Sequence, residues 1–163
     1  MAHNYFAHIK TALEDAASKE NAGPMKAYMR NQFEFFGIKS PDRKLLFKEL
    51  IAAHGLPDVN SLHSLIQQLW KQPEREYQYI GADLMIKMHK QWTEKDIELF
   101  EFMITHRSWW DTVDTVAILI VGPWLKKFPE FRSITDQWID DKNMWLQRSA
   151  IIFQNGYKKS TDE

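Results

Sequence analysis

The chain of 163 residues has no cysteine and only 6 glycines and 6 prolines. Without cysteine it can form neither a disulfide framework nor a thiolate metal site, which fits a reducing cytosol. It has no apolar run of the ~18 residues that a membrane-spanning helix needs, and the longest run covers only residues 116–121. Its first residues lead into a charged amphipathic stretch and lack the apolar core of a secretory signal. We therefore expect a cytoplasmic protein with no membrane partner.

The sequence also lacks an excess of charge of either sign. It carries 21 Lys and Arg residues against 22 Asp and Glu residues, which gives a net charge of −1. Nucleic-acid-binding domains often have a basic excess, so a DNA-binding role would require the cations to gather on one face. The alternative for each cluster is an ordinary solvated helix face. The candidate cations are Lys39, Arg43, Lys44 and Lys48; Lys71 and Arg75; Lys126 and Lys127; Arg148; and Lys158 and Lys159.

What the sequence does contain is helical periodicity along most of its length. Hydrophobic residues make up 44% of the chain, enough for one domain with a real core, and no segment has a convincing strand pattern. Ser40-Pro41 is a strong helix start, and Gly122-Pro123 is expected to end the helix that begins at Trp109. Helices are predicted over residues 5–18, 24–32, 40–55, 59–71, 73–88, 93–104, 109–121, 131–139 and 143–154.

Short loops between these helices favour antiparallel neighbours. Trp70, Trp110 and Trp145 each lie near a predicted helix start, with spacings of 40 and 35 residues. These spacings are close to the period of two-helix HEAT-type repeats, although the alternative is coincidence among 7 tryptophans. The pattern predicts an all-α fold of stacked antiparallel helix pairs, a HEAT-like superhelix with a concave inner surface. We expect a single domain over residues 1–163.

The segment RSWWDTVD at residues 107–114 places two tryptophans and two carboxylates at a predicted helix start. Trp109 and Val113 begin an apolar stripe, whereas Trp110 and Asp114 share another face about 100° round the helix. A tryptophan offers an apolar platform, and the carboxylate beside it offers negative charge in a partly dry place. The alternative is that both tryptophans pack in the core and that Asp114 caps a helix or pairs with a lysine.

A second segment, MWLQRSA at residues 144–150, places Arg148 three residues after Trp145 and just before small residues. The small residues predict a close helix contact, where an arginine must meet an anion. That anion is either a carboxylate of the protein or a phosphate. The 6 histidines have no metal-ligand spacing, and the sequence has neither a glycine-rich phosphate loop nor a cysteine nucleophile. We therefore expect no metal and no organic cofactor.

Four segments resemble one known family. SWWDTVD (108–114), MWLQRSAIIFQ (144–154), LWKQPEREYQ (69–78) and AYMRNQFEFFGI (27–38) are similar, in the same order, to DNA alkylation repair glycosylases of the AlkD type. The resemblance runs from about residue 24 to residue 159. It implies a stack of HEAT-like repeats and an enzyme that excises cationic N3- and N7-alkylated purines from duplex DNA. It also implies hydrolysis of the N-glycosidic bond, in association with the nucleoid.

Carried over by motif, the resemblance makes Asp114 the essential carboxylate and Trp110 an aromatic of the active cleft. Arg148 would contact the DNA backbone near the lesion, and Trp109 and Tyr28 would add to DNA binding. We expect a monomer that lacks the C-terminal helices of the family, and therefore an incomplete DNA-binding surface. The alternative is a non-catalytic HEAT-like module that binds DNA or protein through the same surface.

Overall fold

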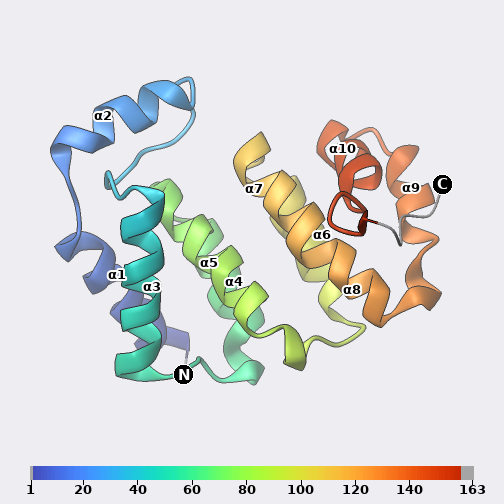
Figure 1. Ribbon diagram of the computed structural model, residues 1–163, viewed down its shortest axis with the longest axis horizontal. Coiled ribbons are helices and arrows are strands. Elements are labelled where there is room, and N and C mark those ends of the chain that lie inside the picture. Colours follow the sequence, from blue (N-terminus) through green and yellow to red (C-terminus); the bar gives the residue numbers. More distant parts are fainter. Residues whose placement is uncertain (1, 159–163) are drawn as a thin grey trace. The chain divides into compact units, whose positions relative to one another are not determined.

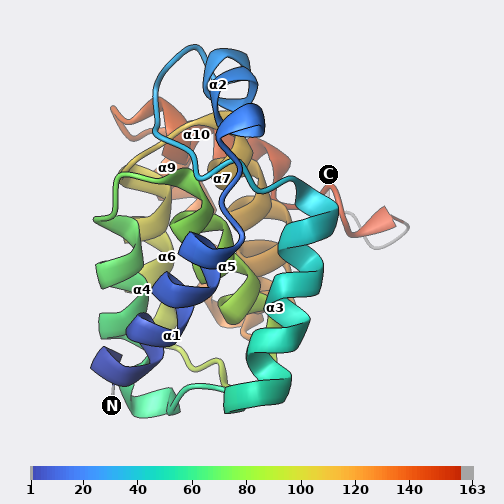
Figure 2. The same cartoon turned by 90° about the vertical axis from the view of Figure 1, so that its left-hand side faces the viewer.

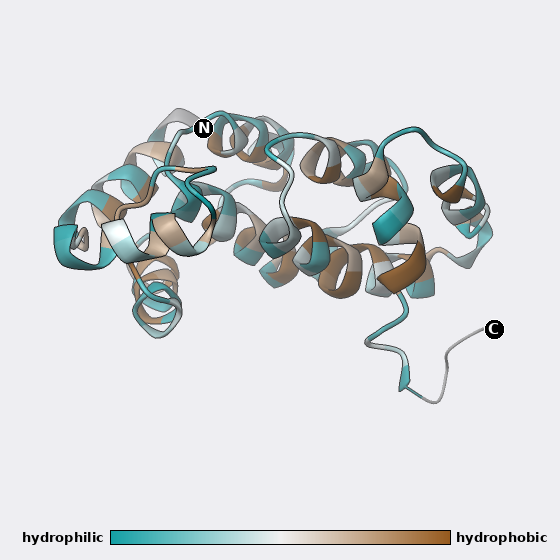
Figure 3. Cartoon of the chain, turned by 90° about the horizontal axis from the view of Figure 1, so that it is seen from above, coloured by the Kyte–Doolittle hydropathy of each residue, from teal (hydrophilic) through white to brown (hydrophobic). Residues whose placement is uncertain are grey.

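The computed structural model describes residues 2–158 as helices joined by short loops (Figure 1). These residues contain no strand, and their one isolated β-bridge joins Glu34 to Glu74. Polar and apolar residues share most of the helices in Figure 3, which is the amphipathic pattern expected of packed helices. Within this part of the chain no helix has the length and apolar character needed to cross a membrane. The all-helical fold class predicted from the sequence is confirmed.

The chain divides into two compact units, Met1–Leu84 and Met85–Glu163. The boundary falls inside helix α5, Arg75–Lys87. The HEAT-like repeat and the single domain over residues 1–163 stay predictions. Lys159, the last of the candidate cations, lies outside the described residues.

The first unit has its core where α1 packs against α3 and α4, and α1 and α3 face the viewer in Figure 2. Ile9 and Leu13 of α1 and Leu65 and Leu69 of α4 are fully buried, at the spacing of a single helix face. The helices of this unit are α1 (Ala2–Asp15), α2 (Lys19–Tyr28), α3 (Ser40–His54), η1 (Val59–Ser61), α4 (Leu62–Trp70) and the first part of α5.

A buried carboxylate holds the segment that links α2 to α3. Both carboxylate oxygens of Glu76 accept backbone N–H groups, from Phe36, Gly37 and Ile38 at 3.0, 2.9 and 3.1 Å. Gly37 has φ +92°, and a Cβ at this position would lie 2.0 Å from the backbone oxygen of Ser18. Only glycine fits there. The PEREYQ motif (residues 73–78) and the FFGI motif (residues 35–38) therefore contact each other through these hydrogen bonds.

The predicted boundaries of α2 and the position of Trp70 are wrong. Ser18, expected to end the first helix, is the N-cap of α2, and its side chain accepts the N–H of Asn21 at 3.4 Å. This serine cap sets the start of α2, so Pro24 lies inside the helix instead of opening it. Trp70 ends α4 and is buried. It therefore does not mark a helix start in a tryptophan repeat.

The second unit has α6 and the continuous helix α7–η3–α8 at its centre, with α10 packed against α6, α7 and η3. Val113, Val116 and Ile120 along the continuous helix are fully buried. Besides the end of α5, this unit contains η2 (His89–Gln91), α6 (Asp96–Thr105), α7 (Trp110–Thr115), η3 (Val116–Val121), α8 (Gly122–Lys127), η4 (Pro129–Phe131), α9 (Ile134–Ile139) and α10 (Met144–Ile152).

The helix that begins at Trp110 does not end at Gly122-Pro123, as the sequence suggested. It passes through the π-helical segment η3 and continues as α8 to Lys127. Pro123 is the second residue of α8 and follows η3 almost directly, so the proline lies next to the π-helical turn inside the continuous helix. A Cβ on Gly122 would lie 2.3 Å from the backbone oxygen of Phe153, so this glycine is needed for close approach of the residues after α10.

Candidate active site

Three of the residues predicted to form the site lie in α7 or cap it: Trp109, Trp110 and Asp114. Trp109 is the N-cap of α7 with an extended backbone, so it stands outside the helix and is half-buried. It therefore does not head the apolar stripe, which instead begins at Val113. Trp110 is the first residue of α7 and is 41% exposed. The exposed tryptophan of the pair is the one that shares a face with Asp114.

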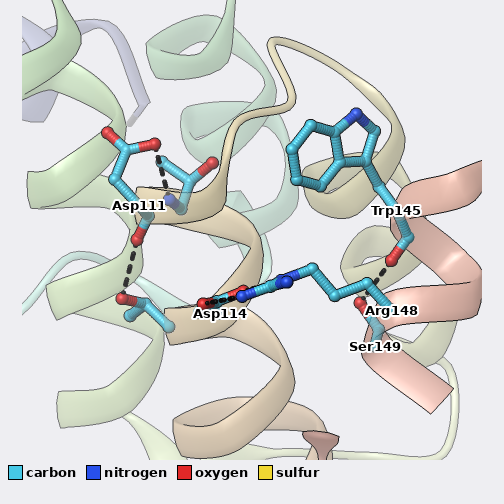
Figure 4. A network of polar contacts seen from close by, with 7 residues as sticks. Asp111, Asp114, Trp145, Arg148 and Ser149 are labelled. Atoms are coloured by element: carbon cyan, nitrogen blue, oxygen red, sulfur yellow. Dashed lines mark hydrogen bonds and ion pairs between the residues drawn. The ribbon is translucent and has the colours of Figure 1, made fainter. Parts of the chain in front are cut away.

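Asp114 is held by Arg148, which reaches it from α10 (Figure 4). Nε of Arg148 donates to Oδ1 of Asp114 at 2.6 Å, and Nη2 donates to Oδ2 at 2.7 Å. The side chain of Arg148 is 45% exposed, and that of Asp114 is 29% exposed. The hydrogen bonds to Asp114 raise the pKa of Arg148 above its ordinary value, so the guanidinium stays charged. Of the two anions predicted for Arg148, the carboxylate is the one found.

This pairing leaves part of the guanidinium available. A guanidinium has five N–H donors, and the two bonds to Asp114 use one from Nε and one from Nη2. Within residues 2–158 the other three have no acceptor. Because the group is also partly exposed, Arg148 can hold Asp114 with one edge and donate to a second anion with the other.

The other carboxylate of the motif serves the helix itself. Oδ1 of Asp111 accepts the N–H of Thr112 at 2.8 Å, and its backbone oxygen accepts the hydroxyl of Thr115 at 3.0 Å (Figure 4). A negative side chain in the first turn also suits the helix dipole. Asp111 thus has a local structural use, which leaves Asp114 as the candidate catalytic carboxylate.

Sequence reasoning did not identify Trp145 as a residue of this region. Its ring packs against that of Trp109, with centroids 6.1 Å apart and planes at 49°. The available signal was its spacing of three residues before Arg148, since residues three apart share a helix face. Ser149 is fully buried and donates to the backbone oxygen of Trp145 at 2.8 Å. This bond lies within α10, so the close helix contact predicted from the small residues after Arg148 stays a prediction.

Tyr28, the remaining predicted site residue, belongs to the first unit. It is the last residue of α2 and is 74% exposed. Arg30 and Asn31 follow it with φ values of 54° and 59°, so a strained left-handed turn comes directly after the exposed ring. The role of Tyr28 in DNA binding stays a prediction.

Besides Arg148, several of the candidate cations have structural contacts, among them Arg75, Arg43 and Lys127. The guanidinium of Arg75 is buried and lies 3.7 Å from the centre of the Phe33 ring. Arg43 donates to Oδ2 of Asp83 at 3.2 Å. Burial raises the pKa of Asp83, and the nearby Arg43 opposes that rise. In the second unit, Nζ of Lys127 donates to the backbone oxygen of Trp92 at 3.0 Å. These contacts weaken the case for all three as phosphate ligands.

The site brings together a carboxylate, a guanidinium and an exposed indole. Asp114 is open enough to face a bound molecule, and a fixed carboxylate can stabilise a developing positive charge or orient a water molecule. Trp110 lies four residues before it and supplies an apolar surface on the same side of α7. Across residues 2–158, no group of three or more His, Asp or Glu side chains is placed to hold a metal ion.

Comparison with known proteins agrees with the motifs. The family model described as DNA alkylation repair enzyme matches residues 9–163. A solved structure described as a predicted DNA alkylation repair enzyme from Enterococcus faecalis is 30% identical, with a TM-score of 0.79. The match covers 90% of this chain and 68% of that one. A search of curated proteins gave no significant match. The chain belongs to the DNA alkylation repair enzyme family.

Proposed function

We propose that this protein is a DNA glycosylase that removes cationic N3- and N7-alkylated purines from duplex DNA. It would act as a monomer on DNA in the cytoplasm. Family membership supports a role in DNA repair. The observation that carries the proposed activity is the partly exposed Asp114, fixed by two hydrogen bonds from Arg148 and four residues from the exposed Trp110.

The proposed reaction needs little more than a fixed negative charge. Alkylation at N3 or N7 makes the purine cationic, so the base leaves as a neutral molecule with the electron pair of the C1′–N9 bond. The sugar left behind resembles an oxocarbenium ion, which the carboxylate of Asp114 would stabilise. A water molecule then adds its oxygen to C1′ and loses a proton. The products are the free base and an abasic sugar.

Arg148 would have two partners in the DNA complex. One edge of its guanidinium keeps the carboxylate of Asp114 in place, and the three remaining donors can reach a phosphate oxygen. In the free protein the positive charge of Arg148 offsets part of the negative charge of Asp114, through the two hydrogen bonds between them. A phosphate that shares Arg148 would leave more of that negative charge acting on the sugar, which strengthens the stabilisation.

The two tryptophans would have different roles. Trp110, with its exposed ring, would pack on the sugar or the lesion and keep water away from the charge of Asp114. Trp109 would contribute to DNA binding through the paired rings of Trp109 and Trp145, which support the entry to α7. Neither role requires reading of the DNA sequence.

The second candidate function is a non-catalytic HEAT-like module that binds DNA or protein. The same ion pair favours it, because a carboxylate that is fully paired with an arginine can serve the packing of α7 on α10 without any chemistry. The two functions differ in whether the charge of Asp114 is needed for turnover.

A duplex carrying one 7-methylguanine, with the free base measured by chromatography, separates the two functions. We expect the wild-type chain to release the base. Asp114→Asn keeps the shape of the side chain and removes its charge, so the rate should fall by on the order of 10²–10³. Asp111→Asn is the matched control, because it removes a carboxylate from the same helix and should keep the activity. Release at the wild-type rate by Asp114→Asn, or no release by the wild type, would favour the non-catalytic module.

A further inference from the structure

The first unit has an open groove of about 650 Å³ between α1 and α3. Its lining residues recur every three to four positions, from His8 to Asp15 on α1, with Ala16 directly after that helix, and from Asp42 to His54 on α3. Each helix therefore presents one complete face to the groove. At a rise of 1.5 Å per residue, the α3 wall is about 18 Å long, or roughly three helical turns.

The floor of this groove is apolar and belongs only in part to the core of the unit, because Leu46 and Leu50 of α3 are buried whereas Leu45 and Ala53 are exposed. Ile9 and Leu13, on another face of α1, are the residues that pack inside the unit. The same wall carries Ala12 of α1 and Ala16 directly after α1, whose small side chains leave room for a further helix to approach closely. On the opposite wall Leu45 is 56% exposed, which leaves a large apolar side chain uncovered within a concave surface.

The charged residues that line the groove are all acidic. They are Asp15, Asp42 and Glu49, and no lysine or arginine lines the groove. Across residues 2–158 none of the three carboxylates forms an ion pair or a side-chain hydrogen bond. A polyanion such as DNA would be repelled here, whereas a cationic partner would find three uncompensated carboxylates beside an apolar floor.

We propose that the groove between α1 and α3 binds a basic amphipathic helix of a partner protein. Apolar side chains spaced along one face of that helix would cover Leu45, Ala12 and Ala16. Its lysines or arginines would meet Asp15, Asp42 and Glu49 at the rims. This interaction surface is separate from base excision and does not depend on the proposed glycosylase activity.

The test uses the full chain and a labelled helical peptide of about three to four turns, built from Leu, Ala and Lys, with fluorescence anisotropy as the measurement. A second peptide with Glu in place of Lys is the charge control. We expect saturable binding of the basic peptide only. Glu49→Lys should weaken that binding by about tenfold, or 1.4 kcal/mol. Leu45→Gln should also weaken it, because the apolar contact is lost.

Glu20→Lys is the matched control, since Glu20 is an exposed carboxylate of α2 that does not line the groove. It should bind the basic peptide as the wild type does, and thermal melting confirms that each variant is folded. Three results would overturn the proposal: binding of neither peptide, equal binding of both peptides, or the same loss of binding in Glu20→Lys. Dimerisation in sedimentation experiments that Leu45→Gln abolishes would assign the groove to a second copy of this chain instead.

Discussion

Arg148 binds both carboxylate oxygens of Asp114, at 2.6 and 2.7 Å, across a separation of 34 residues in the sequence. Because the two side chains are 45% and 29% exposed, solvent screens the pair. Exposed pairs of this kind contribute about 0–1 kcal/mol to stability. The pair therefore matters mainly for geometry. The planar guanidinium of Arg148 binds both carboxylate oxygens and so fixes the direction in which Asp114 points.

The first prediction concerns the planar guanidinium of Arg148. Arg148→Lys keeps the positive charge, but one ammonium group cannot hold both oxygens of Asp114 in a single plane. We expect the rate of base release at saturating enzyme to fall by about tenfold, with a smaller change in affinity for undamaged duplex. Single-turnover kinetics and anisotropy measure the two effects separately. A lysine variant with the wild-type rate would show that Arg148 acts only by attracting phosphate.

The second prediction concerns salt. A chain with a net charge of −1 holds a polyanion only through local cations, so its affinity for undamaged duplex should fall steeply as salt rises. Arg148→Ala removes one proposed phosphate contact. The slope of log K against log salt should then become shallower by about 1. Affinity that stays constant between low and moderate salt would contradict DNA binding by this protein.

Helix positions were predictable from the sequence wherever a local signal stood alone. Ser40-Pro41 marks the start of α3, and the regular spacing of Val113, Val116 and Ile120 gives the buried face of the α7–η3–α8 helix. Where two local signals compete, the sequence does not decide between them. The cap at Ser18 prevails over Pro24 in α2, and the π-helical turn before Gly122-Pro123 lets the helix continue.

The contacts of the candidate site depend on tertiary packing, which a single sequence does not reveal. The sequence required an anion for Arg148 but could not choose between a carboxylate and a phosphate, because α7 and α10 are far apart along the chain. The sequence likewise indicates only a repeat position for Trp145, because its contact with Trp109 forms between segments that are far apart along the chain. Helical spacing did correctly place Trp110 at the surface near Asp114.

The third prediction concerns the buried carboxylate of Glu76, which accepts three backbone N–H groups from residues 36–38. In Glu76→Gln an amide N–H₂ would face one of these donors and leave it without an acceptor. We expect the free energy of unfolding to fall by about 2–4 kcal/mol. The midpoint of thermal unfolding should fall by roughly 5–15 °C. Urea denaturation and calorimetry measure both quantities.

Glu74→Gln is the control for this substitution, because Glu74 lies on the same stretch and its side chain is only half-buried. Its unfolding free energy should stay within about 0.5 kcal/mol of the wild type. Equal stability of the two variants would show that the contacts of Glu76 with residues 36–38 do not hold this segment in place.

The last prediction is that leaving-group charge decides which bases are released. The ionisable side chains that meet at the proposed site are Asp114 and Arg148, and the raised pKa of Arg148 means that it keeps its proton. A cationic alkylpurine leaves without protonation, whereas uracil and hypoxanthine need a proton to leave well. Duplexes that each carry one damaged base, assayed for free base, should therefore yield 7-methylguanine and 3-methyladenine but no uracil or hypoxanthine. Efficient excision of uracil with 7-methylguanine untouched would refute a mechanism built on the charge of Asp114.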